Sequence, residues 1–156
     1  MRISEIMSKN VVVLKPNNTM KHTLALFKKH RMSGFPVVNS KKRLVGVVSE
    51  TDIVNIIDVY HGVQKSESSL MPILISIMQG GEKFENVKAN MKKILKMCVN
   101  EFMKKRVVSV DINEDAYVAV RLMNKKNINR LPVVKNGRLA GIVTRTDIIN
   151  ALIGLE

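Results

Sequence analysis

Residues 46–53 read GVVSETDI and residues 141–148 read GIVTRTDI. Each stretch has a glycine, two β-branched residues, a hydroxyl residue and, three positions after the hydroxyl, an aspartate. This pattern predicts a strand that ends at Ser49 or Thr144 and passes directly into a helix. The two stretches stand 95 residues apart, which indicates that the chain contains an internal repeat.

The residues around the two stretches extend the repeat. Residues 5–38 align with 101–134, so that EIMSKNVVV faces EFMKKRVVS and GFPVV faces RLPVV. After a one-residue deletion in the next loop, RLVGVVSETDIVN aligns with RLAGIVTRTDIIN. We therefore predict a first repeat over residues 1–57, an insert over 58–100 and a second repeat over 101–156.

Each repeat has the order strand, helix, strand, hairpin, strand, helix. In the first repeat we expect strands at 11–14, 35–38 and 44–49, a helix that follows the turn Pro16–Thr19 and runs to about His30, and a helix from about Glu50. In the second we expect strands at 107–110, 131–134 and 139–144, a helix that buries Ala116, Ala119, Val120 and Met123, a hairpin turn at Asn136-Gly137 and a last helix from about Arg145. The fold class is α+β. One unit is too small to close a core, so the two should pack sheet to sheet about a pseudo-twofold axis.

The insert carries a helical pattern of its own. An apolar segment at 70–79, ended by Gly80-Gly81, predicts a short helix. Further on, Val87, Met91, Ile94, Leu95 and Cys98 share one face of an amphipathic helix whose opposite face carries lysines. We expect this helix to pack on the repeats or on a second subunit, and a basic helix on an anionic surface is the alternative.

Composition narrows the class of protein. Lys and Arg number 26 against 13 Asp and Glu, a net charge of +13, which favours anionic partners such as nucleotides, nucleic acid or anionic lipid, or indicates only a solvated lysine-rich surface. Aromatic residues make up 4%, so the core should be aliphatic and rich in methionine. Cys98 is the single cysteine, which excludes an internal disulfide. The apolar stretch 70–78 is too short to span a bilayer and the N-terminus has no signal core, so we expect a cytoplasmic protein without a membrane span.

The repeated hydroxyl-x-x-Asp pattern has two interpretations. As a cap, the hydroxyl of Ser49 or Thr144 accepts from the first turn of the helix and the aspartate reaches back to the cap residue's own N–H. As a ligand site, the helix start and the hydroxyl face a phosphate, while Asp52 or Asp147 accepts from the hydroxyls of a ribose. The two roles are compatible for the hydroxyl but compete for the carboxylate.

The repeated motifs resemble those of a tandem pair of CBS domains, the Bateman module. The resemblance is carried by M-x-x-x-V-V at 7–12 and 103–108, by FPVV at 35–38 and LPVV at 131–134, and by the two G-h-V-[ST]-x-T-D-I junctions. It covers both repeats and leaves the insert outside. It implies two βαββα-type CBS repeats that bind adenosyl ligands such as AMP, ADP, ATP or S-adenosylmethionine, with the aspartate on the ribose and the hydroxyl toward the phosphate.

Carried over residue by residue, the resemblance implies two ligand sites. The first comprises Val12, Phe35, Pro36, Ser49 and Asp52. The second comprises Val108, Arg130, Leu131, Pro132, Thr144, Arg145 and Asp147. Many relatives have a basic residue directly before the h-P-V strand; Arg130 matches it, whereas the first repeat has Gly34 there and Glu50 where the second has Arg145. We therefore predict a phosphorylated ligand at the second site, and at the first site either no ligand or one with less negative charge.

No arrangement in the sequence indicates catalysis. The three histidines and the cysteine have no metal-ligand spacing, and no phosphate-binding glycine loop is present, so we expect no enzyme, no metal and no catalytic cofactor. We predict a stand-alone regulatory module that senses an adenosyl ligand, forms a homodimer and transmits ligand level to an effector protein. The alternative is a basic nucleic-acid-binding protein that uses the repeats as a scaffold; its scarcity of aromatic residues counts against it.

Overall fold

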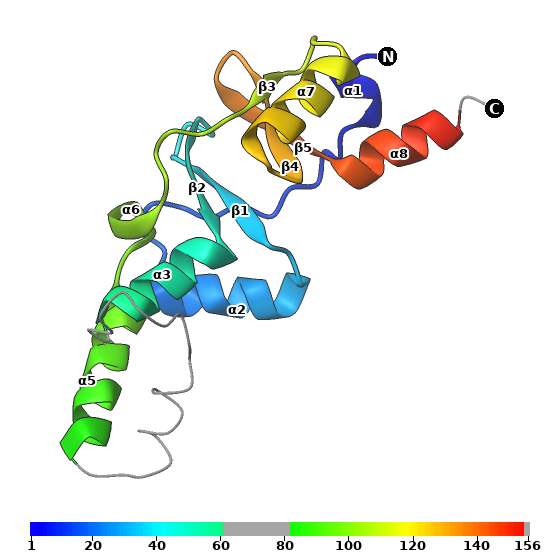
Figure 1. Cartoon of the computed structure of the whole chain (residues 1–156). Coiled ribbons are helices and arrows are strands. Elements are labelled where there is room, and N and C mark those ends of the chain that lie inside the picture. The colour runs from blue at the N-terminus through cyan, green and yellow to red at the C-terminus, as the bar shows by residue number, and fades with distance from the viewer. Residues whose placement is uncertain (61–81, 155–156) are drawn as a thin grey trace. The chain divides into compact units, whose positions relative to one another are not determined.

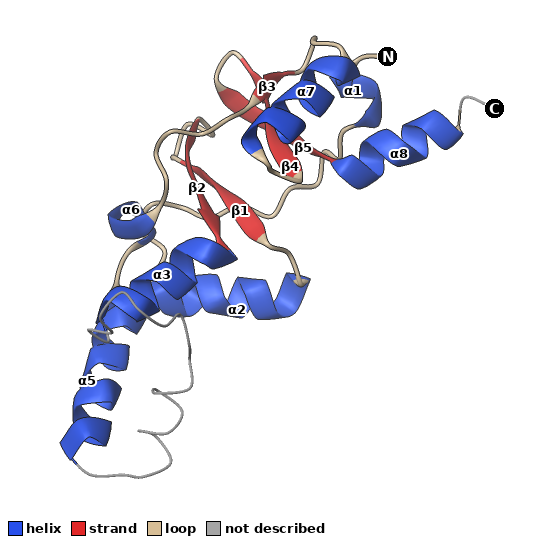
Figure 2. Ribbon diagram, viewed as in Figure 1, coloured by secondary structure: helices blue, strands red, loops and turns tan. Residues whose placement is uncertain are grey.

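The computed structural model describes residues 1–60 and 82–154 (Figure 1). The chain contains both helices and strands, with consecutive helices and consecutive strands in its order, and the predicted α+β fold class is confirmed (Figure 2). In chain order the elements are α1 (Ile3–Ile6), α2 (Met20–His30), β1 (Gly34–Val38), β2 (Leu44–Ser49), α3 (Glu50–Tyr60), α5 (Glu82–Lys96), α6 (Val99–Phe102), β3 (Val110–Asp111), α7 (Ala116–Lys126), β4 (Arg130–Lys135), β5 (Arg138–Thr144) and α8 (Arg145–Ile153). The apolar helix expected at 70–79 lies outside the described residues.

The strands form two small sheets. β1 and β2 make a two-stranded sheet, and the second sheet has the order β3-β4-β5, with β3 parallel and β5 antiparallel to β4. The predicted turn between β4 and β5 is confirmed: Asn136 has φ 52° and Gly137 has φ 75°. Positive φ at both central residues is the geometry of the two-residue hairpin turn that Asn-Gly favours.

The first strand of each repeat is shorter than predicted. Within residues 11–14 only Leu14 pairs with another strand, through a parallel bridge to Val37, and within 107–110 only Val110 is in a strand. The predicted strands over these two ranges were therefore wrong in extent. Their β-branched residues favour an extended backbone, but a strand also needs a hydrogen-bonded neighbour along its length.

Each of the two compact units of the chain draws on both repeats. The first unit comprises residues 1–15, 36–47 and 104–156, and the second comprises 16–35 and 48–103. In the first unit, Ile3 N donates to Glu114 O at 2.9 Å, ahead of α7. In the second, Val99 N donates to Asn18 O at 2.8 Å, ahead of α2. The short helix that opens each repeat thus meets the start of the other repeat's main helix, so the repeat bounds predicted from sequence do not delimit compact units.

The core of the first unit is aliphatic. One buried cluster is formed by residues of α1, the sheet β3-β4-β5 and α7. It includes the flexible side chain of Met123, as expected of a core with few aromatic residues. The cluster consists of Ile3, Val110, Ala116, Ala119, Met123, Leu131, Val133 and Val143. The predicted inward face of α7 is confirmed for three of its four residues, while Val120 is only half-buried.

The second unit is built around α2 and the helix of the insert. α2 begins at the predicted position, with Thr19 Oγ1 accepting from His22 N at 3.2 Å, and ends after His30, where Arg31 has φ 51°. α5 packs against α2 and α3, as predicted for the amphipathic helix. The prediction that Cys98 belongs to this helix was wrong. α5 ends at Lys96, and Cys98 N donates to Glu101 Oε1 at 2.6 Å as the residue that caps α6.

Candidate ligand-binding site

The second strand–helix junction is a complete capping box. Thr144 ends β5 and caps α8. Its Oγ1 accepts from Asp147 N at 3.2 Å, while its own N and Oγ1 both donate to Asp147 Oδ2 at 2.8 Å. These bonds satisfy the start of α8. They occupy Oδ2 alone: among the described residues no donor reaches Oδ1 of Asp147. The cap and an acceptor for ribose hydroxyls can therefore coexist on one carboxylate.

Arg130 lies beside this junction. It is the first residue of β4 and pairs directly with Thr144 across the antiparallel ladder. Its Nε is buried, and within the described part of the chain that atom has no hydrogen-bond partner. A buried donor without a partner costs about 1–3 kcal/mol, and buried polar groups in folded proteins are nearly always bonded. An anion at the junction would supply what this guanidinium lacks.

The remaining predicted residues of the second site have different surroundings. Arg145 is exposed and lines a depression of about 190 Å³ between α7 and α8, together with Val120, Met123, Asn124, Ile148 and Ile149. Leu131 is fully buried in the core cluster and Pro132 is buried beside it, whereas Val108 is half-buried. Of these side chains, Val108 and Arg145 are therefore open to a ligand without repacking of the core.

The first junction repeats the hydroxyl–carboxylate pair. Ser49 N donates to Asp52 Oδ2 at 2.8 Å and Ser49 Oγ donates to the same oxygen at 2.6 Å. Asp52 is only 6% exposed, so it is the more deeply placed of the two aspartates. At the position of Arg130 stands Gly34, where an added Cβ would lie 3.0 Å from the carbonyl oxygen of Val48. The backbone itself thus leaves little room for a side chain there.

The other residues predicted for the first site divide between the two units. Phe35 belongs to the second unit, is fully buried, and stacks edge to face with Phe27 at a centroid distance of 4.8 Å. Val12 and Pro36 belong to the first unit; Pro36 is buried and Val12 is half-buried. Phe35 therefore acts first as a core residue of its unit.

Sequence reasoning overlooked a group of cations at the tips of the two hairpins. Arg43 pairs with Arg138 across an antiparallel bridge, and both line one depression with Lys135. A signal was present, because the two arginines open the aligned stretches RLVG and RLAG. In the described ranges no three His, Cys, Asp or Glu side chains gather as metal ligands, and no helix there is long and apolar enough to cross a bilayer.

Comparison with known proteins gives these features a context. An uncharacterized protein of Methanocaldococcus jannaschii, MJ1426, is 39% identical over 156 residues, covering 98% of this chain and 92% of the relative. The crystal structure of CBSX2 from Arabidopsis thaliana in complex with AMP superposes with a TM-score of 0.71 at 24% identity, covering 99% and 97%. The CBS domain pair of protein MJ0100, in complex with 5′-methylthioadenosine and S-adenosyl-L-methionine, gives a TM-score of 0.65 at 20% identity, covering 100% and 98%.

The solved structures share the fold of this chain, and the family itself follows from the sequence match. The CBS domain model matches residues 3–59 and 99–154, which together make up most of the chain and leave out the insert. Each matched segment contains one of the two strand–helix junctions. The chain belongs to the CBS domain family, as a tandem pair.

Proposed function

We propose that this CBS pair is a regulatory module that binds an adenosyl ligand at the second junction and transmits the level of that ligand to a partner. The observation that carries the proposal is the buried, unpartnered Nε of Arg130 next to a capping box with an unoccupied Oδ1 on Asp147. A nucleoside phosphate offers both groups what they lack, since its phosphate accepts from the guanidinium and its ribose hydroxyls donate to the carboxylate. The AMP complex of CBSX2 supports this ligand class.

In the proposed complex each residue of the second site has a defined role. Asp147 accepts from the ribose, and the start of α8 with Thr144 faces the phosphate. Arg130 and Arg145 neutralise the phosphate charge. Val108 contacts the adenine, while the buried Leu131 and Pro132 hold the strand that flanks it.

The first site is proposed for a ligand with less negative charge, or to stay empty. Its junction offers Ser49 and Asp52 but has Gly34 in place of the arginine and the exposed Glu50 in place of Arg145. A carboxylate at that position repels phosphate and attracts a cationic group, such as the sulfonium and ammonium of S-adenosylmethionine. The MJ0100 complex supports this ligand class. Val12, Phe35 and Pro36 are proposed to flank the base.

Thermal unfolding with a panel of AMP, ADP, ATP, S-adenosylmethionine and duplex DNA tests the proposal. A ligand at about 100 times its Kd stabilises the folded state by about 2.7 kcal/mol, a shift of several degrees in Tm for a chain of this size. Asp147→Asn should abolish most of the AMP shift, and Asp52→Asn, the matched change at the other junction, should leave it in place. If no adenosyl ligand raises Tm, or if Asp147→Asn lowers only the Tm of the free protein, the junction is a cap and the proposal fails.

A second copy of this chain is the proposed structural partner. α8 leaves three large apolar side chains exposed, with Ile149 at 56%, Leu152 at 58% and Ile153 at 64%. An apolar group of this kind on one helix is typical of a surface that another molecule covers. Sedimentation should show a dimer that Leu152→Glu converts to a monomer, whereas a wild-type monomer would contradict this assignment. The effector is proposed to be another protein, and the module to act by binding, without enzymatic activity.

A further inference from the structure

The tips of the two hairpins meet within the first unit and form a fixed frame. Leu44 N donates to Gly137 O at 3.2 Å, and Leu139 N donates to Lys42 O at 3.0 Å. Between these bonds Arg43 and Arg138 pair across an antiparallel bridge. Asn39 Oδ1 accepts from Lys41 N and Arg43 N at 3.0 Å each, which holds the turn of the first hairpin. The backbone that carries both arginines is therefore set before any ligand arrives.

A depression of about 620 Å³ lies against this frame, which we name the hairpin-tip site. It is lined by Arg43, Lys135, Asn136, Arg138, Leu139 and Ala140. Three of these side chains are cationic and none is acidic. The volume falls in the range of small-molecule sites.

The guanidinium of Arg43 lies close to Gly137. A Cβ on Gly137 would lie 2.8 Å from Nη2 of Arg43, and the residue has φ +75°, which side chains other than glycine rarely adopt. The absence of a side chain at Gly137 thus leaves room for the guanidinium of Arg43 beside the turn. Arg43 of the first hairpin is in this way brought against the turn of the second hairpin.

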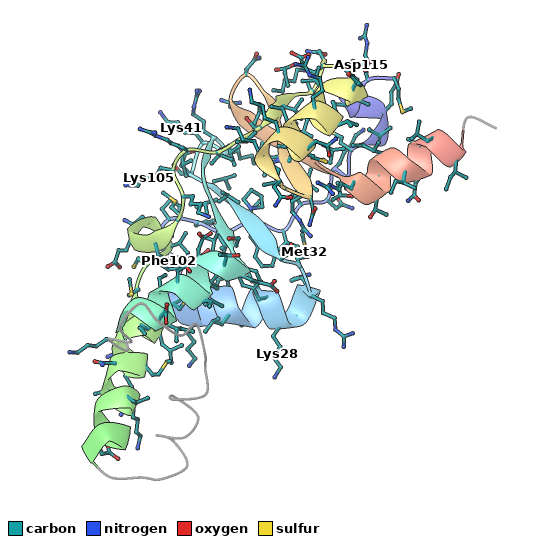
Figure 3. The ribbon with its side chains drawn as sticks, in the orientation of Figure 1. Lys28, Met32, Lys41, Phe102, Lys105 and Asp115 are labelled. Atoms are coloured by element: carbon teal, nitrogen blue, oxygen red, sulfur yellow. The ribbon has the colours of Figure 1, made fainter. Side chains whose placement is uncertain are left out.

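The described part of the chain does not compensate the charges at the hairpin-tip site. In residues 1–60 and 82–154, Arg43, Lys135 and Arg138 take part in no ion pair and their side chains donate no hydrogen bond. Like charges directly opposite each other on paired strands are destabilising. Lys41, at the turn of the first hairpin (Figure 3), and Lys42 are also exposed and add to the positive potential. An anion in the depression would relieve this repulsion.

We propose that the hairpin-tip site binds a small polyphosphate anion, a diphosphate or triphosphate group. Two guanidinium groups and an ammonium suit several phosphoryl oxygens at once, because arginine donates in a fixed fork. The lining has no aromatic side chain on which a base could stack, so the site should recognise charge and not base. Duplex or single-stranded nucleic acid is accordingly the less favoured occupant.

The hairpin-tip site is separate from the junction proposed to bind the nucleoside. Both lie on the hairpin of β4 and β5, but at opposite ends: Arg130 pairs with Thr144 at one end and Lys135 with Arg138 at the other. Arg130 and Lys135 are five residue steps apart, which is about 17 Å along the strand. The two sites can therefore be inactivated one at a time.

Calorimetric titration with sodium tripolyphosphate at low salt tests the proposal. The double variant Arg43→Ala/Arg138→Ala should bind tripolyphosphate roughly tenfold or more weakly than the wild type, since two charge-assisted contacts are lost. Lys135→Ala should also weaken binding. Because Lys135 is exposed, this variant should fold normally, so it tests the site even if the double variant does not fold. The matched control is Arg121→Ala, which removes an exposed arginine of α7 in the same unit, and should bind as the wild type does.

Three outcomes would overturn the assignment. Absence of tripolyphosphate binding by the wild type is the first, and an equal loss in Arg121→Ala is the second, since it would indicate only a general charge effect. The third is a higher affinity for duplex DNA than for tripolyphosphate, lost in the same arginine variants. That result would make this face a nucleic-acid interface. AMP binding by the double variant separates this proposal from the nucleoside site, because it should stay at the wild-type level whether or not tripolyphosphate binds.

Discussion

The two strand–helix junctions have the same capping pair in different surroundings. At each junction the backbone N–H and the hydroxyl of one residue donate to the same oxygen of the aspartate three residues later. For Ser49 the two distances to Asp52 Oδ2 are 2.8 Å and 2.6 Å. For Thr144 both distances to Asp147 Oδ2 are 2.8 Å. In the second repeat the pair completes a capping box at the helix start, and in the first it binds the backbone N–H of the residue before the helix, whether or not a ligand is present. Its recurrence is therefore explained by folding, and by itself it does not identify a binding site.

The residues that differ between the junctions are the informative ones. Arg130 faces Thr144 across the ladder with a buried, unpartnered Nε, whereas Gly34 at the aligned position is closed off by the carbonyl of Val48. Folding does not need a buried Nε without a partner, since that arrangement costs stability. The contrast teaches that the cation, more than the capped aspartate, distinguishes the junction that is proposed to bind a phosphate.

The largest effect is expected from Arg130→Ala. It should weaken AMP binding roughly ten- to hundredfold, because a charged donor to the phosphate contributes about 1.5–3 kcal/mol. Adenosine, which has no phosphate, should bind both proteins equally. Calorimetric titration of both ligands into the wild type and the variant measures the difference.

The stability of the same variant provides a control. Removal of a buried donor without a partner should leave the free energy of unfolding in urea unchanged or raise it. If Arg130→Ala instead unfolds the protein, the arginine is structural and the contrast between the junctions loses its functional meaning. Arg121→Ala, which changes an exposed arginine on α7, should alter neither binding nor stability.

A smaller effect is expected when the missing cation is placed in the first repeat. Gly34→Arg should lower the free energy of unfolding by about 1–3 kcal/mol, since its Cβ would press on the carbonyl oxygen of Val48 at 3.0 Å. Urea denaturation measures this loss. Ser33→Arg adds the same charge at an exposed neighbouring residue and should change stability by less than about 0.5 kcal/mol. A stable Gly34→Arg variant that gains a second AMP site would show that one side chain, and not the backbone, separates the junctions.

The sequence was informative wherever a local pattern determines structure. The hairpin turn at Asn136-Gly137, the start of α2 at Thr19 and the strand–helix junctions follow from residues that are close in the sequence, and each was predicted correctly. Strands 11–14 and 107–110 were predicted too long because their pairing depends on distant partners. Cys98 was assigned to the wrong helix because its capping role depends on Glu101 rather than on the apolar period.

For the candidate site, sequence could name residues but not their environments. It named Asp147 from the repeat and Arg130 from the family resemblance, yet the burial of one nitrogen and the unoccupied oxygen of one carboxylate appear only in three dimensions. It also grouped Leu131 with the ligand contacts, although that side chain is fully buried in the core. The pairing of Arg43 with Arg138 joins turns 95 residues apart, and no local pattern predicts it.

The smallest effect concerns the caps of the two main helices, which occupy aligned positions but differ in chemistry. Thr19 caps α2 with a hydroxyl, whereas Asp115, labelled at α7 in Figure 3, caps that helix with a carboxylate that accepts from Tyr117 N at 2.8 Å. This hydrogen bond, and after it the contact of Asp115 Oδ2 with the N-terminal amine of Met1 at 3.3 Å, hold the pKa of Asp115 below its ordinary value of 3.8. Because the pKa is lower in the folded state, the stabilisation is fully present above the ordinary value and is lost as the pH falls through the folded one.

Exchange of the two caps measures that difference. Between about pH 6 and pH 3 the Tm of the wild type should fall by roughly one degree more than that of Asp115→Thr, since the hydroxyl does not titrate in this range. Thr19→Asp should give α2 an acid sensitivity of the same sign but smaller size, because Asp115 also accepts from the N-terminal amine of Met1. If the Tm difference between the wild type and Asp115→Thr stays constant over this range, the carboxylate contributes as a neutral acceptor would, and the two caps are equivalent in chemistry as well as in position.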